Sequence, residues 1–216
     1  RLVQHLNEYA NLYYEHAGVG FDESIRLVRW HSPMYQAITY QKGSLVLHAL
    51  RFMMEDEAFF AALREYASRY AFQGTLVEDF QEVCQEFYRP EPQAPELLHQ
   101  EEYSDLSWFF EQWLDRPGFP ILKIESVIMT PNDARYRIEV RIIQAGEIYW
   151  LPVELRLSGA RESLTRRIWL TEKEHLFEFD LSWIPQEIEL DPNHWILKNP
   201  SPRFLRWQLR EDAGGR

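Results

Sequence analysis

The chain has 216 residues, of which 45% are hydrophobic and 26% are charged, as expected for a globular protein with one large or two small domains. Its formal net charge is −11, with 9 Lys and Arg against 19 Asp and Glu in residues 1–117 and 14 against 15 in residues 118–216. The acidic first part argues against a nucleic acid as partner, and the lack of any run of about 18 uncharged apolar residues argues against a transmembrane helix.

The first part of the chain has the apolar period of helices. Thr75 and Glu78 form the pattern of a capping box, and Gln73-Gly74 just before them breaks the chain. Residues 89–102 contain three prolines, which predicts a surface connection. We therefore expect six helices, over residues 2–16, 22–30 and 36–54, from an Asp56 cap to the break at residue 73, from Thr75 to about Tyr88, and from Ser104 to the Asp115-Arg116-Pro117-Gly118 segment.

From Phe119 onward the apolar period changes from 3.6 to 2. Strands are predicted over residues 121–127, 136–142, 150–157, 164–170, 175–181 and 186–190. The closing stretch contains three prolines and is expected to be irregular or an edge strand. Six or seven short strands at this spacing are typical of a small antiparallel sandwich. We expect an α+β protein of two domains, a helical domain over residues 1–117 and a β-sandwich over residues 118–210.

A tyrosine lies at the start of one predicted helix, in the segment Ala37-Ile38-Thr39-Tyr40-Gln41-Lys42-Gly43. The residues one turn beyond Tyr40 are Gly43 and Ser44, which are too small to cover its ring, so we expect the phenol to project into a cavity. A phenol has a reference pKa of about 10 and stays protonated at neutral pH. Such a donor, aimed at an oxygen that becomes negative during a reaction, stabilises the transition state. The alternative is an ordinary amphipathic tyrosine, since the chain has eleven.

Cysteine and histidine provide no evident metal site. Cys84 is the single cysteine, which excludes a disulfide framework, and it lies on the apolar stripe of a predicted helix, where a buried and unreactive thiol is expected. His5 and His16 are about 16 Å apart along a helix, too far to share a zinc ion with bonds of about 2 Å. We expect satisfied or exposed side chains at all seven histidines, which are His5, His16, His31, His48, His99, His175 and His194.

The order of four segments resembles the zinc aminopeptidases of the aminopeptidase N family, which belong to the gluzincins. These segments are Tyr40-Gln41-Lys42-Gly43, Asp79-Phe80, the run from Ser107 to Leu114, and Arg116-Pro117-Gly118-Phe119-Pro120 at the entry to the β domain. The resemblance implies that residues 1–117 are the helical C-terminal part of a thermolysin-like catalytic domain. It also implies that the Tyr40 hydroxyl binds the oxyanion of the peptide intermediate opposite the zinc ion. Lys42 is expected to cap a helix or face solvent, and Gly43 to permit close packing.

Other parts of the family pattern are absent from this chain. It lacks the His-Glu-x-x-His zinc motif, the later glutamate ligand and the Gly-rich segment that holds the substrate amine. Because the chain opens on Arg1, we expect it to begin inside a longer protein. The resemblance then implies zinc and peptide substrates for the full-length protein, with no zinc bound by this chain and no activity of the chain alone. Oligomeric state, side-chain specificity and compartment, cytoplasmic or exported, stay open.

Two other functions are compatible with the sequence. The first is a non-catalytic scaffold or interaction protein with an aminopeptidase-like fold. The second is an adhesion or carbohydrate-binding module, in which exposed tryptophans would serve as stacking platforms. For the second we prefer the simpler interpretation that these side chains fill the core. The tryptophans of the β domain are Trp150, Trp169, Trp183, Trp195 and Trp207.

Overall fold

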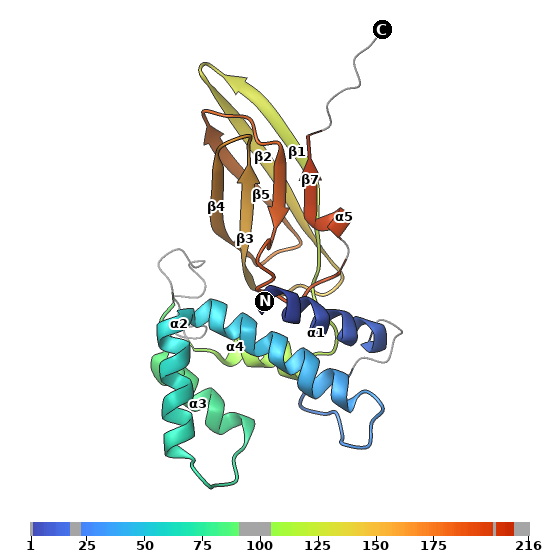
Figure 1. The fold of residues 1–216 in the computed structure, drawn as a ribbon, viewed down its shortest axis with the longest axis vertical. Helices are drawn as coiled ribbons and strands as arrows, with labels where there is room; N and C mark the ends of the chain where they lie inside the picture. The colour runs from blue at the N-terminus through green and yellow to red at the C-terminus, as the bar shows by residue number, and fades with distance from the viewer. Residues whose placement is uncertain (1, 18–22, 91–104, 201, 210–216) are drawn as a thin grey trace. The chain divides into compact units, whose positions relative to one another are not determined.

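The computed structural model describes residues 2–17, 23–90, 105–200 and 202–209 (Figure 1). The chain forms two compact units, Arg1–Gly118 and Phe119–Arg216, which we describe separately. Within the described residues the first is built of helices, and the second of antiparallel strands with one short helix. The predicted α+β class is therefore confirmed. No helix among these residues combines the length and the apolar character needed to span a membrane.

The helical unit contains the expected helices except one. Residues 23–30, within the helix predicted over residues 22–30, form turns instead. The hydroxyl of Ser24 accepts from the Leu27 N–H at 3.2 Å, a local side-chain bond of the kind that competes with helix formation. The predicted start at Ser104 and the connection over residues 91–102 lie outside the described residues. The segments are α1 (Leu2–Ala17), η1 (Ala37–Lys42), α2 (Gly43–Arg69), α3 (Val77–Phe87), α4 (Ser107–Phe110) and η4 (Glu111–Asp115), of which η1 and η4 are π-helical.

The predicted break between two helices near residue 55 is a kink inside α2. Glu55 has φ 66° and ψ 161°, outside the helical region, while the helix continues on both sides. Arg51 binds the carboxylate of Asp56 through two hydrogen bonds, Nε to Oδ1 at 2.7 Å and Nη2 to Oδ2 at 2.8 Å. The side chain predicted to cap a new helix therefore forms a bidentate ion pair across the kink.

The predicted capping box at the start of α3 is displaced by one residue. The carboxylate of Asp79 accepts from the N–H of Leu76 at 2.7 Å, so the box is closed by Asp79 and not by Glu78. The Thr75 hydroxyl is engaged elsewhere, because it accepts from the Tyr66 hydroxyl at 2.7 Å. The helix therefore starts one residue later than predicted, with Leu76 as its N-cap and Asp79 at the third helical position.

Aromatic rings join α2, α3 and α4. Phe80 on α3 lies edge-on to Tyr66 on α2 and to Phe110 on α4, with ring centroids 5.2 and 6.3 Å apart. Cys84, also on α3, is fully buried, and burial raises the pKa of its thiol to about 12. The predicted buried and unreactive cysteine is confirmed.

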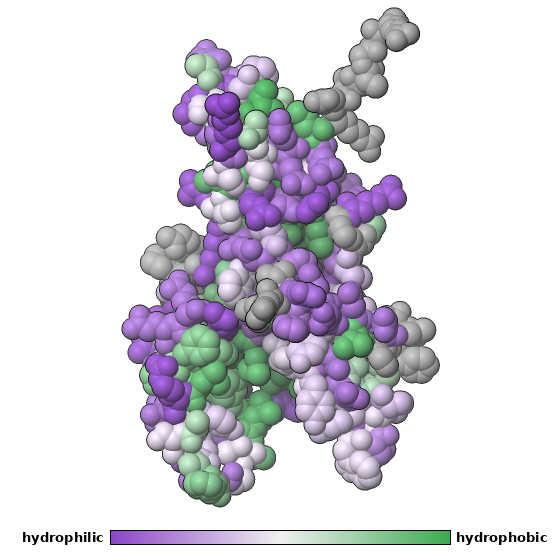
Figure 2. Space-filling view, viewed as in Figure 1, coloured by the Kyte–Doolittle hydropathy of each residue, from purple (hydrophilic) through white to green (hydrophobic). Residues whose placement is uncertain are grey.

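Some apolar side chains stay on the surface of this unit. Figure 2 shows them gathered over α2 and α3, and the exposed apolar residues of this part include Phe60, Phe72, Leu76 and Val77. Phe72, in the turn between the two helices, has φ 63°. Exposed apolar side chains are normal on globular proteins, so we assign no binding function to these residues on exposure alone.

The β unit contains two antiparallel sheets, with strand orders β1-β2-β5 and β4-β3-β6-β7. Each predicted strand overlaps an observed one, and the closing stretch provides a short helix and an edge strand. The elements are β1 (Ile121–Asn132), β2 (Arg135–Ala145), β3 (Leu151–Ser158), β4 (Ser163–Leu170), β5 (Glu174–Leu181), β6 (Glu187–Leu190), α5 (Pro202–Leu205) and β7 (Arg206–Gln208).

Alternate residues of the central strands form the core of this unit. On β2 the fully buried residues are Ile138, Val140 and Ile142, and on β3 they are Val153, Leu155 and Leu157. A side chain added at Gly159, after β3, would place its Cβ 2.8 Å from the ring of Trp183. This close approach explains why glycine occupies the turn between β3 and β4.

Candidate functional site

Tyr40 lies in η1, where the chain makes a π-helical turn before α2 begins. The hydroxyl of Ser44 donates to the carbonyl oxygens of Tyr40 and Gln41, at 2.7 and 3.0 Å. The N–H of Gly43 contacts the carbonyl oxygens of Ile38 and Tyr40. These bonds satisfy backbone groups that the change from π to α geometry would otherwise leave open. Single π turns inside helices are frequent at functional sites.

The ring of Tyr40 is accessible. The residue is 62% exposed, as expected from the small side chains one turn beyond it. Tyr35 lies edge-on to it, with ring centroids 6.2 Å apart and an interplanar angle of 86°. Within this unit, therefore, the Tyr40 hydroxyl can reach a group that binds beside η1, while Tyr35 supports one side of the ring.

Of the two expectations for Lys42, solvent exposure was wrong, whereas a capping role agrees with its contact at the C-cap residue of η4. The residue is fully buried, its Nζ lies 3.4 Å from the carbonyl oxygen of Arg116, and the same atom lies 5.8 Å from the centroid of the Tyr13 ring. Arg116 directly follows η4, where helix carbonyls lack partners within the helix and the helix dipole is negative. The ammonium group of Lys42 therefore ties η1 to the end of η4 and stacks on an aromatic face.

A second connection reaches the same end of η4. The N–H of Arg26 donates to the carbonyl oxygen of Leu114 at 3.0 Å, and its Nε donates to Oδ1 of Asp115 at 2.5 Å. Its Nη1 also binds Glu78. The hydrogen bonds to Asp115 and Glu78 outweigh burial and raise the pKa of Arg26 above its ordinary value. Two segments that precede α2 are thus anchored at one point.

Gly43 is not required for close packing in this unit. A Cβ added there would meet only the carbonyl oxygen of Ile38, at an ordinary contact distance of 3.9 Å. Its backbone is right-handed helical, with φ −56°, which any residue adopts. The expected packing role is therefore not found. Next to it, the buried Oε1 atom of Gln41 has no hydrogen-bond partner among the described residues.

The histidines of the described residues form no metal centre. Among the described residues, no group of three or more His, Cys, Asp or Glu side chains lies close enough to hold a metal ion. His175 Nε2 accepts from the N–H groups of Thr171 and Glu172 at 2.9 and 3.0 Å, so it caps the turn between β4 and β5. Burial lowers the pKa of His175. The side chains of His16 and His99 lie outside the described part of the chain.

The tryptophans of the β unit are not exposed platforms. Trp169 is buried, and the other four, Trp150, Trp183, Trp195 and Trp207, are partly buried. A sugar-binding tryptophan needs an open face, so this burial favours the interpretation that these rings fill the core.

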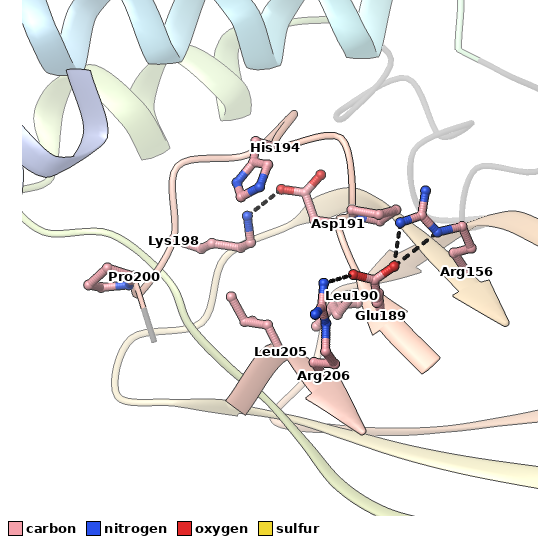
Figure 3. A pocket seen from close by; sticks show the side chains of 10 residues that line it. Arg156, Glu189, Leu190, Asp191, His194, Lys198, Pro200, Leu205 and Arg206 are labelled. Atoms are coloured by element: carbon pink, nitrogen blue, oxygen red, sulfur yellow. Dashed lines mark hydrogen bonds and ion pairs between the residues drawn. The ribbon is translucent and has the colours of Figure 1, made fainter. Parts of the chain in front are cut away.

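A polar cavity of about 270 Å³ lies in the β unit (Figure 3). The register of β3, β6 and β7 aligns Arg156, Glu189 and Arg206 across three neighbouring strands. Both guanidinium groups bind the Glu189 carboxylate. Burial acts to raise the pKa of Glu189, but the hydrogen bonds from both arginines outweigh it, so the pKa lies below its ordinary value. The negative charge of Glu189 is therefore bound by the positive charges of both arginines.

A buried ion pair lines the same cavity. Nζ of Lys198 lies 2.6 Å from Oδ2 of Asp191, and Figure 3 shows the two side chains pointing toward one another. The Asp191 carboxylate also accepts from the N–H groups of Trp195 and Ile196, at 2.8 and 3.1 Å. Burial is the main cause that lowers the pKa of His194 beside them, and Lys198 lowers it further. The charges in this cavity bind one another, as in a structural cluster.

Comparisons with known proteins point to a class of peptidases. Residues 20–113 match the sequence model of the Peptidase family M1 domain, a range that includes Tyr40 and Lys42. The fold is similar to that of Legionella pneumophila aminopeptidase A, solved in complex with aspartic acid, with a TM-score of 0.57 and 16% identity over 78% of this chain and 18% of that one. The resemblance to aminopeptidases is therefore supported by sequence in the helical unit and by fold over most of the chain.

Two curated proteins are similar in sequence. Aminopeptidase N of Lactococcus lactis subsp. lactis is 31% identical over 91 residues, which are 42% of this chain and 9% of that protein. Probable aminopeptidase 1 of Sulfurisphaera tokodaii is 21% identical over 131 residues, which are 61% of this chain and 15% of that protein. The chain thus spans less than a fifth of the length of each of these relatives.

Proposed function

We propose that this chain is part of a zinc-dependent aminopeptidase that removes N-terminal residues from peptides, and that Tyr40 stabilises the oxyanion of the tetrahedral intermediate. The observation that carries the proposal is the match of residues 20–113 to the Peptidase family M1 domain, within which Tyr40 is an accessible phenol on a π-helical turn. The names of both similar curated proteins, which are aminopeptidases, support the same reaction class.

The role of Tyr40 follows from the chemistry of peptide hydrolysis. Addition of water to the peptide carbonyl places negative charge on its oxygen, and a fixed hydroxyl donor stabilises that charge more than it stabilises the neutral substrate. Loss of one such donor typically raises the barrier by about 3–4 kcal/mol. The bonds of Ser44 and Lys42 hold the backbone of η1, so the donor starts from a fixed position.

Zinc is implied by the family, but the residues described here do not fit a zinc site. We therefore assign this chain only the phenol donor, and we derive no step through the metal ion. The proposal places the zinc ligands, the base and the substrate amine site in other parts of the full-length protein. We expect the 216-residue chain by itself to be inactive and to bind no catalytic zinc.

The test is the turnover of an aminoacyl-coumarin substrate by the full-length protein. Tyr40→Phe should lower kcat by about a hundredfold or more and leave the zinc content unchanged, because only the hydroxyl donor is lost. The matched control is Tyr35→Phe, which removes a hydroxyl from the neighbouring ring and should keep near-normal turnover. Normal turnover of Tyr40→Phe would show that Tyr40 is a packing residue. Turnover by the isolated 216-residue chain would contradict the proposal that the zinc ligands and the base lie in other parts of the full-length protein.

A non-catalytic scaffold with an aminopeptidase-like fold is the second candidate. It would share the accessible tyrosine but not the reaction. A full-length protein that lacks a His-Glu-x-x-His motif and shows no turnover or zinc would support it. We prefer the enzyme because both similar curated proteins are named as aminopeptidases.

A further inference from the structure

The two edges of the β unit are built differently. At one edge α5 packs against both β1 and β7, and β1 also contacts β7, so the two sheets are bridged. At the other edge β4 and β5 line a hollow of about 480 Å³. We call this hollow the β4–β5 slot. Its lining residues are Leu164, Arg166, Arg167, Ile168 and the run from Phe177 to Leu181.

The strand register shows which side chains face the inside of the slot. Cross-strand partners project to the same side of a sheet. On β4, Leu164 pairs with Leu157 and Ile168 pairs with Val153, both of which are core residues. By the same register, Arg166 pairs with core residue Leu155, so it also belongs to the inner face.

The opposite wall of the slot is aromatic. On β5, Phe177 pairs with Val140 and Phe179 pairs with Ile138, and both partners on β2 are fully buried. The two phenylalanines are only partly buried, because β5 is the last strand of its sheet. The slot therefore has apolar walls from both sheets and a guanidinium group on its inner face.

The charges around the slot leave Arg166 available. Asp180 pairs with Arg135, Nε to Oδ1 at 2.5 Å, and Glu178 pairs with Arg137, so the acids of β5 are compensated by their neighbours on β2. Arg166 is exposed and has no ion-pair partner among the described residues. A cation beside apolar walls favours a ligand that brings a carboxylate together with an apolar group.

The backbone of β4 is also available. In the described part of the chain β4 pairs only with β3, so one row of its N–H and C=O groups faces no strand. Such an edge pairs readily with an added extended chain, in which main-chain hydrogen bonds provide affinity and alternate side chains provide specificity. An inward-facing charge opposes the pairing of an apolar strand, but it selects a strand that carries the opposite charge.

We propose that the β4–β5 slot binds an extended acidic segment of another polypeptide, which adds to β4 as a further strand. Its alternate side chains enter the slot, where a carboxylate pairs with Arg166 and an apolar side chain two residues away packs on Phe177 and Phe179. Residues two apart on a strand face the same side, so this spacing matches the slot. The site does not depend on the proposed peptidase reaction.

The test uses the 216-residue chain and a fluorescent peptide with the sequence acetyl-Val-Thr-Leu-Thr-Glu-Thr-Val-amide, measured by fluorescence anisotropy. We expect saturable binding, and about tenfold weaker binding of the same peptide with Lys in place of Glu. Arg166→Glu should reverse this preference. The matched control is Arg161→Glu, an equal change of charge in the exposed turn after β3, which should leave both affinities unchanged.

The reversal of preference separates the proposal from misfolding, because an unfolded variant would bind neither peptide. Equal binding of the Glu and Lys peptides, or no binding at millimolar concentration, would overturn the proposal. Self-association of the chain in sedimentation experiments that Arg166→Glu abolishes, and that the Glu peptide does not displace, would also overturn it. That result would identify the slot as a contact between copies.

Discussion

The helical unit and the β unit both bury charged side chains, but these side chains have different structural roles. In the helical unit the ammonium group of Lys42 binds the backbone carbonyl of Arg116 and so joins two chain segments beside the candidate site. In the β unit Asp191 and Lys198 bind one another within a single turn region. A buried cation on a carbonyl positions backbone, whereas a buried ion pair mainly avoids the cost of its own desolvation. The two units should therefore respond differently to loss of charge.

The largest expected effect is in the β unit. Asp191→Ala should lower the free energy of unfolding by about 3–5 kcal/mol, because it leaves the ammonium group of Lys198 buried without its carboxylate. The matched control is Asp133→Ala, since Asp133 also has φ 53° but is exposed. The control should cost no more than about 1 kcal/mol. Urea denaturation followed by hydrogen exchange of the β strands measures both, and equal losses would assign the effect to backbone conformation.

A smaller effect is expected for Lys42→Met in the helical unit. Methionine keeps most of the side-chain volume but leaves the carbonyl of Arg116 without this donor, which should cost about 1–3 kcal/mol. Hydrogen exchange should increase most in residues 37–46 and 111–116. Arg64→Met changes an exposed residue of α2 and should stay within about 0.5 kcal/mol. An unchanged exchange rate in residues 37–46 would contradict the anchoring role of Lys42.

Replacement of a glycine by alanine should also change stability differently in the two units. Gly159→Ala should destabilise the β unit by about 1–3 kcal/mol, because the new Cβ would lie 2.8 Å from the ring of Trp183. Gly74→Ala, in the turn before α3, meets no atom within 4 Å and should be neutral or stabilise by up to about 1 kcal/mol. Thermal unfolding compares the two variants. If Gly74→Ala loses as much stability as Gly159→Ala, steric contact with Trp183 is not the cause of the destabilisation.

The smallest effect concerns pH. The folded-state pKa values of His194 and His175 are both lowered, so the unfolded chain binds these protons first, and stability falls as the pH drops below the ordinary histidine pKa of about 6.5. The lowered pKa of Glu189 adds a further loss below the ordinary glutamate pKa of about 4.3. His194→Gln should reduce the first loss, measured as urea midpoints between neutral pH and pH 5 or so. An identical pH profile for this variant would exclude His194 as the source.

Much of the candidate site was predictable from residue size. Gly43 and Ser44 one turn beyond Tyr40 predicted an uncovered ring, and the residue is 62% exposed, whereas the projection of the phenol into a cavity stays a prediction. The place of Lys42 was not predictable, because a helical period shows which face is apolar but not which distant carbonyl lies beneath it. The burial of Lys42 depends on Arg116, 74 residues away in the chain. The only local signal was its position between the buried residues Ile38 and Leu45.

The sequence by itself determined most of the elements of this protein and their order, although residues 23–30 form turns and the predicted break near residue 55 is a kink. Apolar periods of 3.6 and 2 reflect backbone geometry, so they predicted most of the helices and strands and the change from helices to strands along the chain. Contacts between groups that are distant in the chain were determined only by the tertiary structure. The Thr75 hydroxyl binds Tyr66 on α2, and Asp79 rather than Glu78 closes the capping box of α3. In the β unit, α5 covers one edge of the sheets, while β4 and β5 line a hollow at the other. Such outcomes depend on three-dimensional proximity, which a local pattern does not encode.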